Sequence, residues 1–141
     1  MAETGRDAGV TPGILAVIAA GGVLGALARY GVETAAPTPA GGFPWATFGV
    51  NVAGCAGIGA LMVLILEVWR PHPLLRPFLT VGVLGGFTTF STYAVEARAL
   101  AADRPVLAIG YVVGTVLAAG AAVAGATALT RRWVRRGGRS R

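Results

Sequence analysis

The sequence predicts an all-α membrane protein with four transmembrane helices, the third of which is broken at mid-membrane. The chain has 141 residues, of which 55% are hydrophobic, and a soluble domain of this size could not bury that much apolar surface. Most of this surface lies in four runs that lack charged residues: 8–28, 34–66, 77–95 and 105–130. Each run contains about the 20 residues that are needed to cross a hydrocarbon core.

Proline, glycine and tryptophan residues set the helix boundaries. We expect helices over 12–32, 45–69, 73–101 and 105–133, joined by one loop rich in Pro and Gly and by two short turns that contain proline. Trp45, Trp69 and Trp133 fall at the ends of these segments, as interfacial anchors do. The sequence therefore predicts one transmembrane domain, 13–130, between a polar tail, 1–12, and an arginine-rich tail, 131–141.

The third run contains a polar segment split by glycines, residues 85–92 (GGFTTFST). We expect the helix to break at Gly85 and Gly86. Unwound backbone at this depth persists only where protein buries it or where it lines a watery cavity. Broken helices at the midplane hold ions in many membrane proteins. Because the segment offers carbonyl and hydroxyl oxygens but no charge, it is suited to a small ion.

The net charge of +6 is unevenly distributed, and every basic residue except the lone His72 is an arginine. Six arginines lie between Arg131 and Arg141, directly after the last run, which favours an anchor on anionic lipid over a nucleic-acid site. Four spans put both termini on one side of the membrane, together with nine of the twelve arginines. The positive-inside rule then predicts cytoplasmic termini and a multi-pass protein of the cell membrane.

Two polar residues on the first and second helices are candidates for anion binding. Asn51 is the only amide side chain in the chain, and it lies inside the second run. It either forms an interhelical hydrogen bond or, beside a broken helix, donates to an anion. Arg29, at the end of the first helix, either snorkels to the headgroups or attracts anions into a vestibule.

Further candidates follow the break and lie on the fourth helix. Phe90 and Tyr93 are three residues apart, and an aromatic ring can present its electropositive edge to an anion. Ser91, Thr92 and Thr115 could add hydroxyl groups along the same path. The alternatives are ordinary core packing for the rings and hydrogen bonds back to the same helix for the hydroxyls.

Missing features narrow the function. The acidic residues fall near run ends, whereas a proton-coupled exporter such as a small multidrug-type transporter needs a carboxylate within the membrane. No catalytic triad, metal cluster or phosphate loop is recognisable, so an enzyme is not expected. A non-transporting membrane scaffold is the third alternative. A dimer or larger assembly is expected, because the polar residues of so small a bundle need a protein partner.

Three motifs resemble one family in the same order along the chain. Residues 21–30 (GGVLGALARY), 44–54 (PWATFGVNVAG) and 85–93 (GGFTTFSTY) resemble the first, second and broken third helices of the CrcB/Fluc fluoride channels. The resemblance covers residues 12–130. It implies a channel that passively exports fluoride and so lowers its toxicity, and that forms a dimer of two antiparallel subunits. The second ring position holds Tyr93, where the family usually has Phe.

The resemblance also implies roles for single residues. A structural Na⁺ would be held by the backbone carbonyls of Gly85 and Thr88 from both subunits. Asn51 would donate a hydrogen bond to fluoride, Phe90 would present a ring edge, Thr115 would belong to a polar track, and Arg29 would lie near the vestibule. The arginine bias favours one fixed orientation and therefore an oppositely oriented paralogue as the partner. A second copy of this chain is the alternative, because the homodimer is the commoner arrangement in the family.

Overall fold

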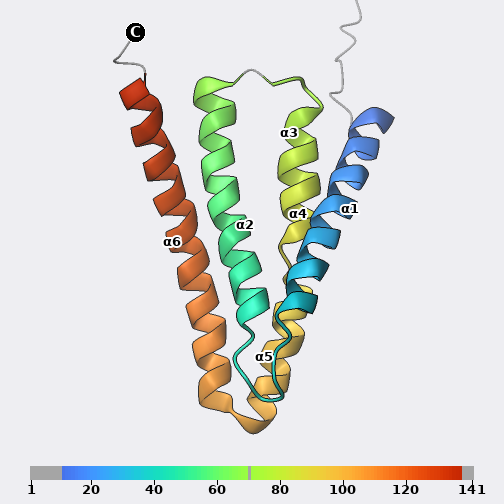
Figure 1. Ribbon diagram of the computed structural model, residues 1–141, viewed down its shortest axis with the longest axis vertical. Helices are drawn as coiled ribbons and strands as arrows, with labels where there is room; N and C mark the ends of the chain where they lie inside the picture. Colours follow the sequence, from blue (N-terminus) through green and yellow to red (C-terminus); the bar gives the residue numbers. More distant parts are fainter. Residues whose placement is uncertain (1–10, 70, 138–141) are drawn as a thin grey trace, which may run out of the picture.

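The computed structural model describes residues 11–69 and 71–137, and four long helical segments dominate it. They span Pro12–Ala35, Trp45–Val68, Leu75–Asp103 and Pro105–Gly137, and each is long and apolar enough to cross a membrane. In Figure 1 the segments run side by side, and the start of the first lies at the same end of the bundle as the end of the last. The predicted all-α fold with four membrane-spanning helices is confirmed.

The first, second and fourth segments are continuous, whereas the third consists of several helical pieces. The continuous ones are α1 (Pro12–Ala35), α2 (Trp45–Val63) with its π-helical extension η1 (Leu64–Val68), and α6 (Pro105–Gly137). The third segment consists of α3 (Leu75–Pro77), the π-helical η2 (Phe78–Val83), α4 (Leu84–Phe87) and α5 (Ser91–Asp103). Proline begins α1 and α6, where its missing N–H is not needed. The Thr11 side chain caps α1 by accepting from the Ile14 amide at 3.4 Å.

The end of the last helix differs from the expectation. α6 continues past Trp133 into the arginine-rich tail, because arginine is a good helix former and its long side chain can reach water from a helix end. Arg131 Nε donates to Glu67 Oε1 at 2.6 Å and ties α6 to η1. Most of the predicted tail 1–12 and the last four residues of the tail 131–141 lie outside the described residues.

Glycines bring α1 into backbone contact with the third segment. A Cβ atom added to Gly25 would come within 2.7 Å of the Phe87 amide nitrogen, and one added to Gly82 within 2.8 Å of the Ile18 carbonyl oxygen. Small residues allow such close approach between helices in lipid. Two of the small-residue pairs in the sequence, Gly21 with Gly25 and Gly82 with Gly86, therefore form the crossing between α1 and the η2–α4 stretch.

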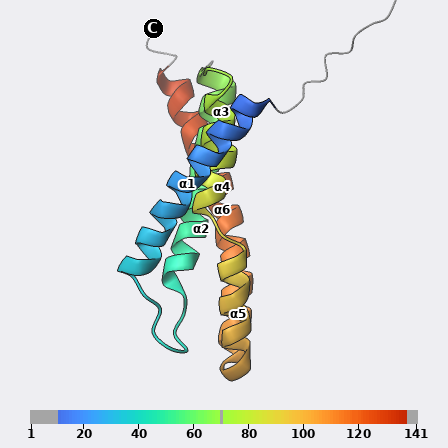
Figure 2. The same ribbon diagram turned by 90° about the vertical axis from the view of Figure 1, so that its right-hand side faces the viewer.

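The third span breaks three residues later than expected. The prediction of a break at Gly85 and Gly86 is wrong, because both glycines are part of α4. Thr88 is the first extended residue, with φ −75° and ψ 155°, and α5 begins at Ser91. Gly86 is needed for the close contact with α1, where an added Cβ would meet the Gly22 backbone. Figure 2 shows the thin, unwound segment of the chain between α4 and α5.

Candidate functional site

Asn51 holds the unwound segment from α2. Its Nδ2 donates to the Thr89 carbonyl at 3.0 Å, and its Oδ1 accepts from the Thr89 amide at 2.9 Å. One side chain thus satisfies both backbone groups of a residue that has left the helix, which would otherwise be costly at this depth. A carboxamide has two N–H hydrogens. One remains after the bond to Thr89 and can serve a further acceptor.

The break removes the helical donors of several carbonyls, among them those of Gly85 and Thr88. In a continuous helix the Thr89 amide would bond the Gly85 carbonyl, and the Thr92 amide would bond the Thr88 carbonyl. The first amide bonds Asn51 instead, and the second bonds Thr89 Oγ1 at 3.2 Å. The carbonyl oxygens of Gly85 and Thr88 are therefore released by the same side chains that stabilise the unwound segment.

Hydroxyl groups cluster in the break around Thr89. Its Oγ1 donates to Thr92 Oγ1 at 3.1 Å and lies 3.3 Å from Ser91 Oγ. Thr89 is buried, Thr92 is half-buried and Ser91 is exposed. The predicted hydroxyls of Ser91 and Thr92 are thus placed together, next to the unwound backbone.

A hollow of about 280 Å³ lies beside the break. It brings together four of the residues predicted for the anion path, Asn51, Phe90, Tyr93 and Thr115. The Phe90 ring is 80% exposed, whereas Tyr93 is 8% exposed. The two ring centroids are 5.7 Å apart and the ring planes are tilted by 44°. Asn51 thus shares the hollow with two aromatic side chains, while Ser91 and Thr92 are not among the residues that line it.

The hydroxyl groups of the hollow already have acceptors. Tyr93 Oη donates to the Val112 carbonyl at 3.1 Å, and Thr115 Oγ1 donates to the Tyr111 carbonyl at 2.7 Å. In this arrangement neither hydroxyl hydrogen points to an ion in the hollow. The remaining Asn51 N–H and the ring edges are then the groups left to meet an anion.

A second, smaller hollow of about 170 Å³ adjoins the break, and Gly85 and Thr88 are among its lining residues. Thr88 and Cys55 line both hollows. Gly85 has open space where a Cβ atom would be. Within the described part of the chain, no group of three or more His, Cys, Asp or Glu side chains could hold a metal ion. A cation at the break would therefore depend on neutral oxygen atoms.

The sequence reasoning missed a second polar cluster, centred on Glu96 of α5. Thr47 Oγ1 donates to Glu96 Oε1 at 2.9 Å, and Tyr111 Oη donates to Glu96 Oε2 at 2.8 Å. Thr47 and Tyr111 are 1% and 0% exposed. Glu96 directly follows the charge-free run 77–95, as expected, and its carboxylate links α5 to α2 and α6. Thr47 precedes Asn51 by four residues, and Tyr111 precedes Thr115 by four, so helical spacing could have revealed the cluster.

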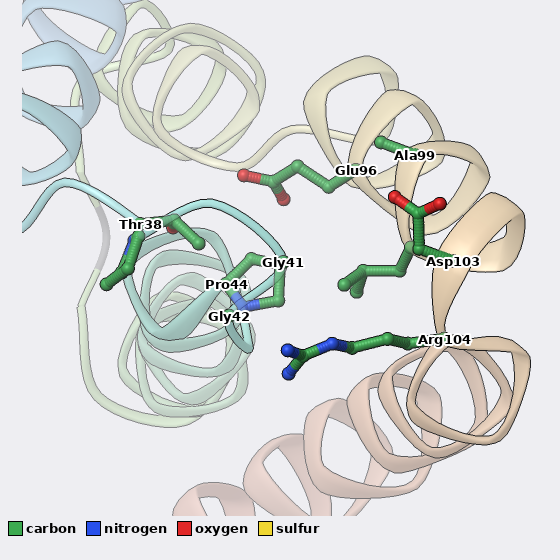
Figure 3. A pocket seen from close by; sticks show the side chains of 10 residues that line it. Thr38, Gly41, Gly42, Pro44, Glu96, Ala99, Asp103 and Arg104 are labelled. Carbon is green, nitrogen blue, oxygen red and sulfur yellow. The ribbon is translucent and has the colours of Figure 1, made fainter.

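Glu96 also lines a hollow of about 190 Å³ between the α1–α2 loop and the α5–α6 turn. Figure 3 shows the Glu96 carboxylate and the Arg104 side chain entering this space from opposite sides, with loop residues Gly42 and Pro44 beside it. Glu96 thus belongs both to this hollow and to the cluster with Thr47 and Tyr111.

Arg29 lies apart from these hollows. Its Nε donates to the Gly86 carbonyl at 3.3 Å, and its Nη1 pairs with Glu33 Oε1 at 3.4 Å. The structure therefore places the predicted Arg29 at the crossing of α1 and α4, and it is not among the residues that line the hollow of Asn51.

Comparison with known proteins agrees with this architecture. The family model described as CrcB-like protein, Camphor Resistance (CrcB), matches residues 16–127. The chain is 55% identical over 132 residues to the fluoride-specific ion channel FluC 2 of Nocardia farcinica, and the match covers 93% of this chain and 94% of that protein. It is 59% identical over 111 residues to the fluoride-specific ion channel FluC 1 of Streptomyces coelicolor, covering 78% and 72% of the two chains.

Replacing Asn51 by Leu should destabilise the protein, because the Thr89 amide and carbonyl would lose their partner in an apolar environment. We expect a loss of about 1–3 kcal/mol, measured as a lower melting temperature in detergent. Thr115→Val is the matched control, since it removes a hydroxyl that bonds only its own helix. Equal melting temperatures of the two variants would contradict the role given to Asn51.

Proposed function

The chain belongs to the CrcB-like protein family, and we propose that it is a fluoride-selective ion channel through which fluoride leaves the cytoplasm passively. The relatives of this length are named fluoride-specific ion channels, and the matches extend over most of both chains. The observation in the structure that carries the proposal is the hollow at the break, where an amide N–H and two aromatic rings meet without a fixed charge.

Fluoride is small and strongly hydrated, so a pathway must replace its water shell without binding it too tightly. The remaining N–H of Asn51 can donate one hydrogen bond, and the Phe90 and Tyr93 rings can present their electropositive edges. Ser91 and Thr92 add rotatable hydroxyls at the break, and Thr115 can contribute if its hydroxyl turns away from the Tyr111 carbonyl. Several weak donors in series suit rapid passage better than one strong charge does.

The alternatives fit the site less well. A small multidrug-type transporter needs a membrane carboxylate that is open to a cationic substrate. Glu96 lies within the third span, but its two oxygens accept from the buried Thr47 and Tyr111 hydroxyls. A non-transporting scaffold would need no hollow that joins Asn51 to an exposed Phe90. The multi-pass fold and the arginine distribution support a place in the cell membrane with cytoplasmic termini.

The same break suits a structural sodium ion. Released backbone carbonyls coordinate Na⁺ at broken helices in membrane proteins, and the Gly85 and Thr88 carbonyls are among those that lose their helical donors here. These neutral oxygens would hold the ion, which would supply a fixed positive charge beside the anion path. Gly85 is exposed on the protomer, which leaves room for the same carbonyls of a second subunit.

A dimer of antiparallel subunits would cover the apolar surface at the break. Phe90 is 80% exposed, although it adjoins the polar hollow. A second subunit at this face would enclose the hollow and place the ring at the interface. The partner is a second copy of this chain or an oppositely oriented paralogue, and the excess of arginines on one side of the membrane favours a fixed orientation for this chain.

Phe90→Ala should weaken the protection that the channel gives to a fluoride-sensitive bacterial strain. Removal of the ring edge should slow fluoride flux about tenfold, which corresponds to roughly 1.4 kcal/mol. The measurement is the fluoride concentration that halves growth, at matched protein levels. Val95→Ala, at an exposed position on α5, should protect like the wild type. Full protection by Phe90→Ala would favour the scaffold.

Replacing Na⁺ by N-methyl-D-glucamine during purification should lower the melting temperature, because the Gly85 and Thr88 carbonyls would lose their partner. Titrating Na⁺ back should restore it in a saturable manner, and the Asn51→Leu variant should respond less. A melting temperature that does not depend on Na⁺ would argue against the cation at the break.

A single orientation should appear in the labelling of the C-terminal tail. A cysteine added after Arg141 in a Cys55→Ala background should react with a membrane-impermeant maleimide only after the cells are opened. Labelling of a large fraction of tails in intact cells would instead support a homodimer of this chain with both orientations.

A further inference from the structure

Arg29 and Glu33 form a connection between α1 and the end of α4. Arg29 Nε donates to the Gly86 carbonyl at 3.3 Å, and its Nη1 lies 3.4 Å and 3.5 Å from the two carboxylate oxygens of Glu33. Both side chains are 25% exposed in the protomer. The pair is one helical turn apart on α1, so Glu33 can fix the orientation of the guanidinium.

The backbone contact between the helices brings Arg29 to this point. Gly25 lies one turn before Arg29 and packs directly on the backbone of Gly86 and Phe87. The next turn of α1 therefore passes the end of α4. A side chain at Gly25 would separate the helices and move the guanidinium away from the carbonyl.

The Gly86 carbonyl needs a donor that the helix does not supply. In a continuous helix it would accept from the Phe90 amide, but α4 ends at Phe87 and the chain is extended at Thr88. Arg29 Nε takes the place of that amide. Its positive charge also lies at the carboxyl end of a helical stretch that runs from Leu75 to Phe87, where a cation is favoured.

Side chains from two different helices hold the unwound segment and the end of α4. Asn51 of α2 holds Thr89, while Arg29 of α1 holds Gly86, three residues earlier. The carbonyls of Gly85 and Thr88 alternate with these two fixed residues along the chain. Their positions therefore depend on both side chains.

We propose that Arg29 is a positioning residue for the break, that Glu33 fixes its guanidinium, and that the pair acts on fluoride passage through the backbone and not by attracting anions. The flux part of this inference rests on the proposed function. A vestibule role and a positioning role predict opposite changes in fluoride flux. We call the contact of the Arg29–Glu33 pair with the Gly86 carbonyl the clamp. If Arg29 attracted anions, removing the neighbouring negative charge of Glu33 would raise fluoride flux at low ionic strength, whereas loss of the clamp would lower it.

Three variants separate these roles. Glu33→Gln removes the charge that orients Arg29, and Arg29→Lys keeps the positive charge but loses the planar group that reaches Gly86 and Glu33 together. Thr34→Val is the control on the same turn, since the Thr34 hydroxyl bonds only the Tyr30 carbonyl, at 2.7 Å. Hydrogen exchange of peptides over residues 84–92 is measured in detergent, and fluoride efflux from vesicles is measured at low and high ionic strength.

The clamp predicts that Arg29→Lys and Glu33→Gln each speed amide exchange over 84–92 about tenfold and lower fluoride efflux equally at both ionic strengths, while Thr34→Val matches the wild type. Wild-type exchange in both variants would overturn the inference. So would a rise in efflux in Glu33→Gln, or efflux in Arg29→Lys equal to that of the wild type. If Arg29→Lys does not fold, the Glu33→Gln result decides alone. A wild-type chain without fluoride efflux, both alone and together with an oppositely oriented paralogue, would refute the proposed function, and the exchange data would still decide whether the clamp exists.

Discussion

Unwound backbone inside a membrane must find hydrogen-bond partners within the protein, and the organisation of the third span follows from this constraint. The chain leaves the helix at Thr88 and re-enters it at Ser91. Asn51 meets both backbone groups of Thr89, and the Thr89 hydroxyl receives the Thr92 amide. The only carboxamide in the sequence is therefore used where an acceptor and a donor are needed at one residue.

Satisfying these groups creates the chemistry of the site. The amides that turn to Asn51 and to the Thr89 hydroxyl release the carbonyls of Gly85 and Thr88, which are available for a cation. The same break leaves an N–H of Asn51 and the Phe90 ring beside a hollow that is open on the protomer surface. One interruption of a helix thus offers oxygens to a cation on one side and weak electropositive groups to an anion on the other.

The sequence was sufficient for the four spans and for the convergence of Asn51, Phe90, Tyr93 and Thr115, because charge-free runs and isolated polar residues are strong signals in a membrane protein. It was misleading about the position of the break, since a glycine can mark either an unwound turn or a close helix contact, and at Gly86 only the packing against Gly22 decides between them. The Glu96 cluster was missed because its partners Thr47 and Tyr111 come from two other helices, and only their helical spacing from Asn51 and Thr115 could have indicated it. The positions of all these residues are defined by the structure, and their roles toward an ion stay predictions.

The most direct test is ion efflux from liposomes that contain the purified chain, followed with a fluoride electrode and, in parallel, a chloride electrode. A fluoride-selective channel should give rapid fluoride efflux without measurable chloride efflux. Comparable efflux of both ions, or no fluoride efflux from folded protein either alone or together with an oppositely oriented paralogue, would contradict this account.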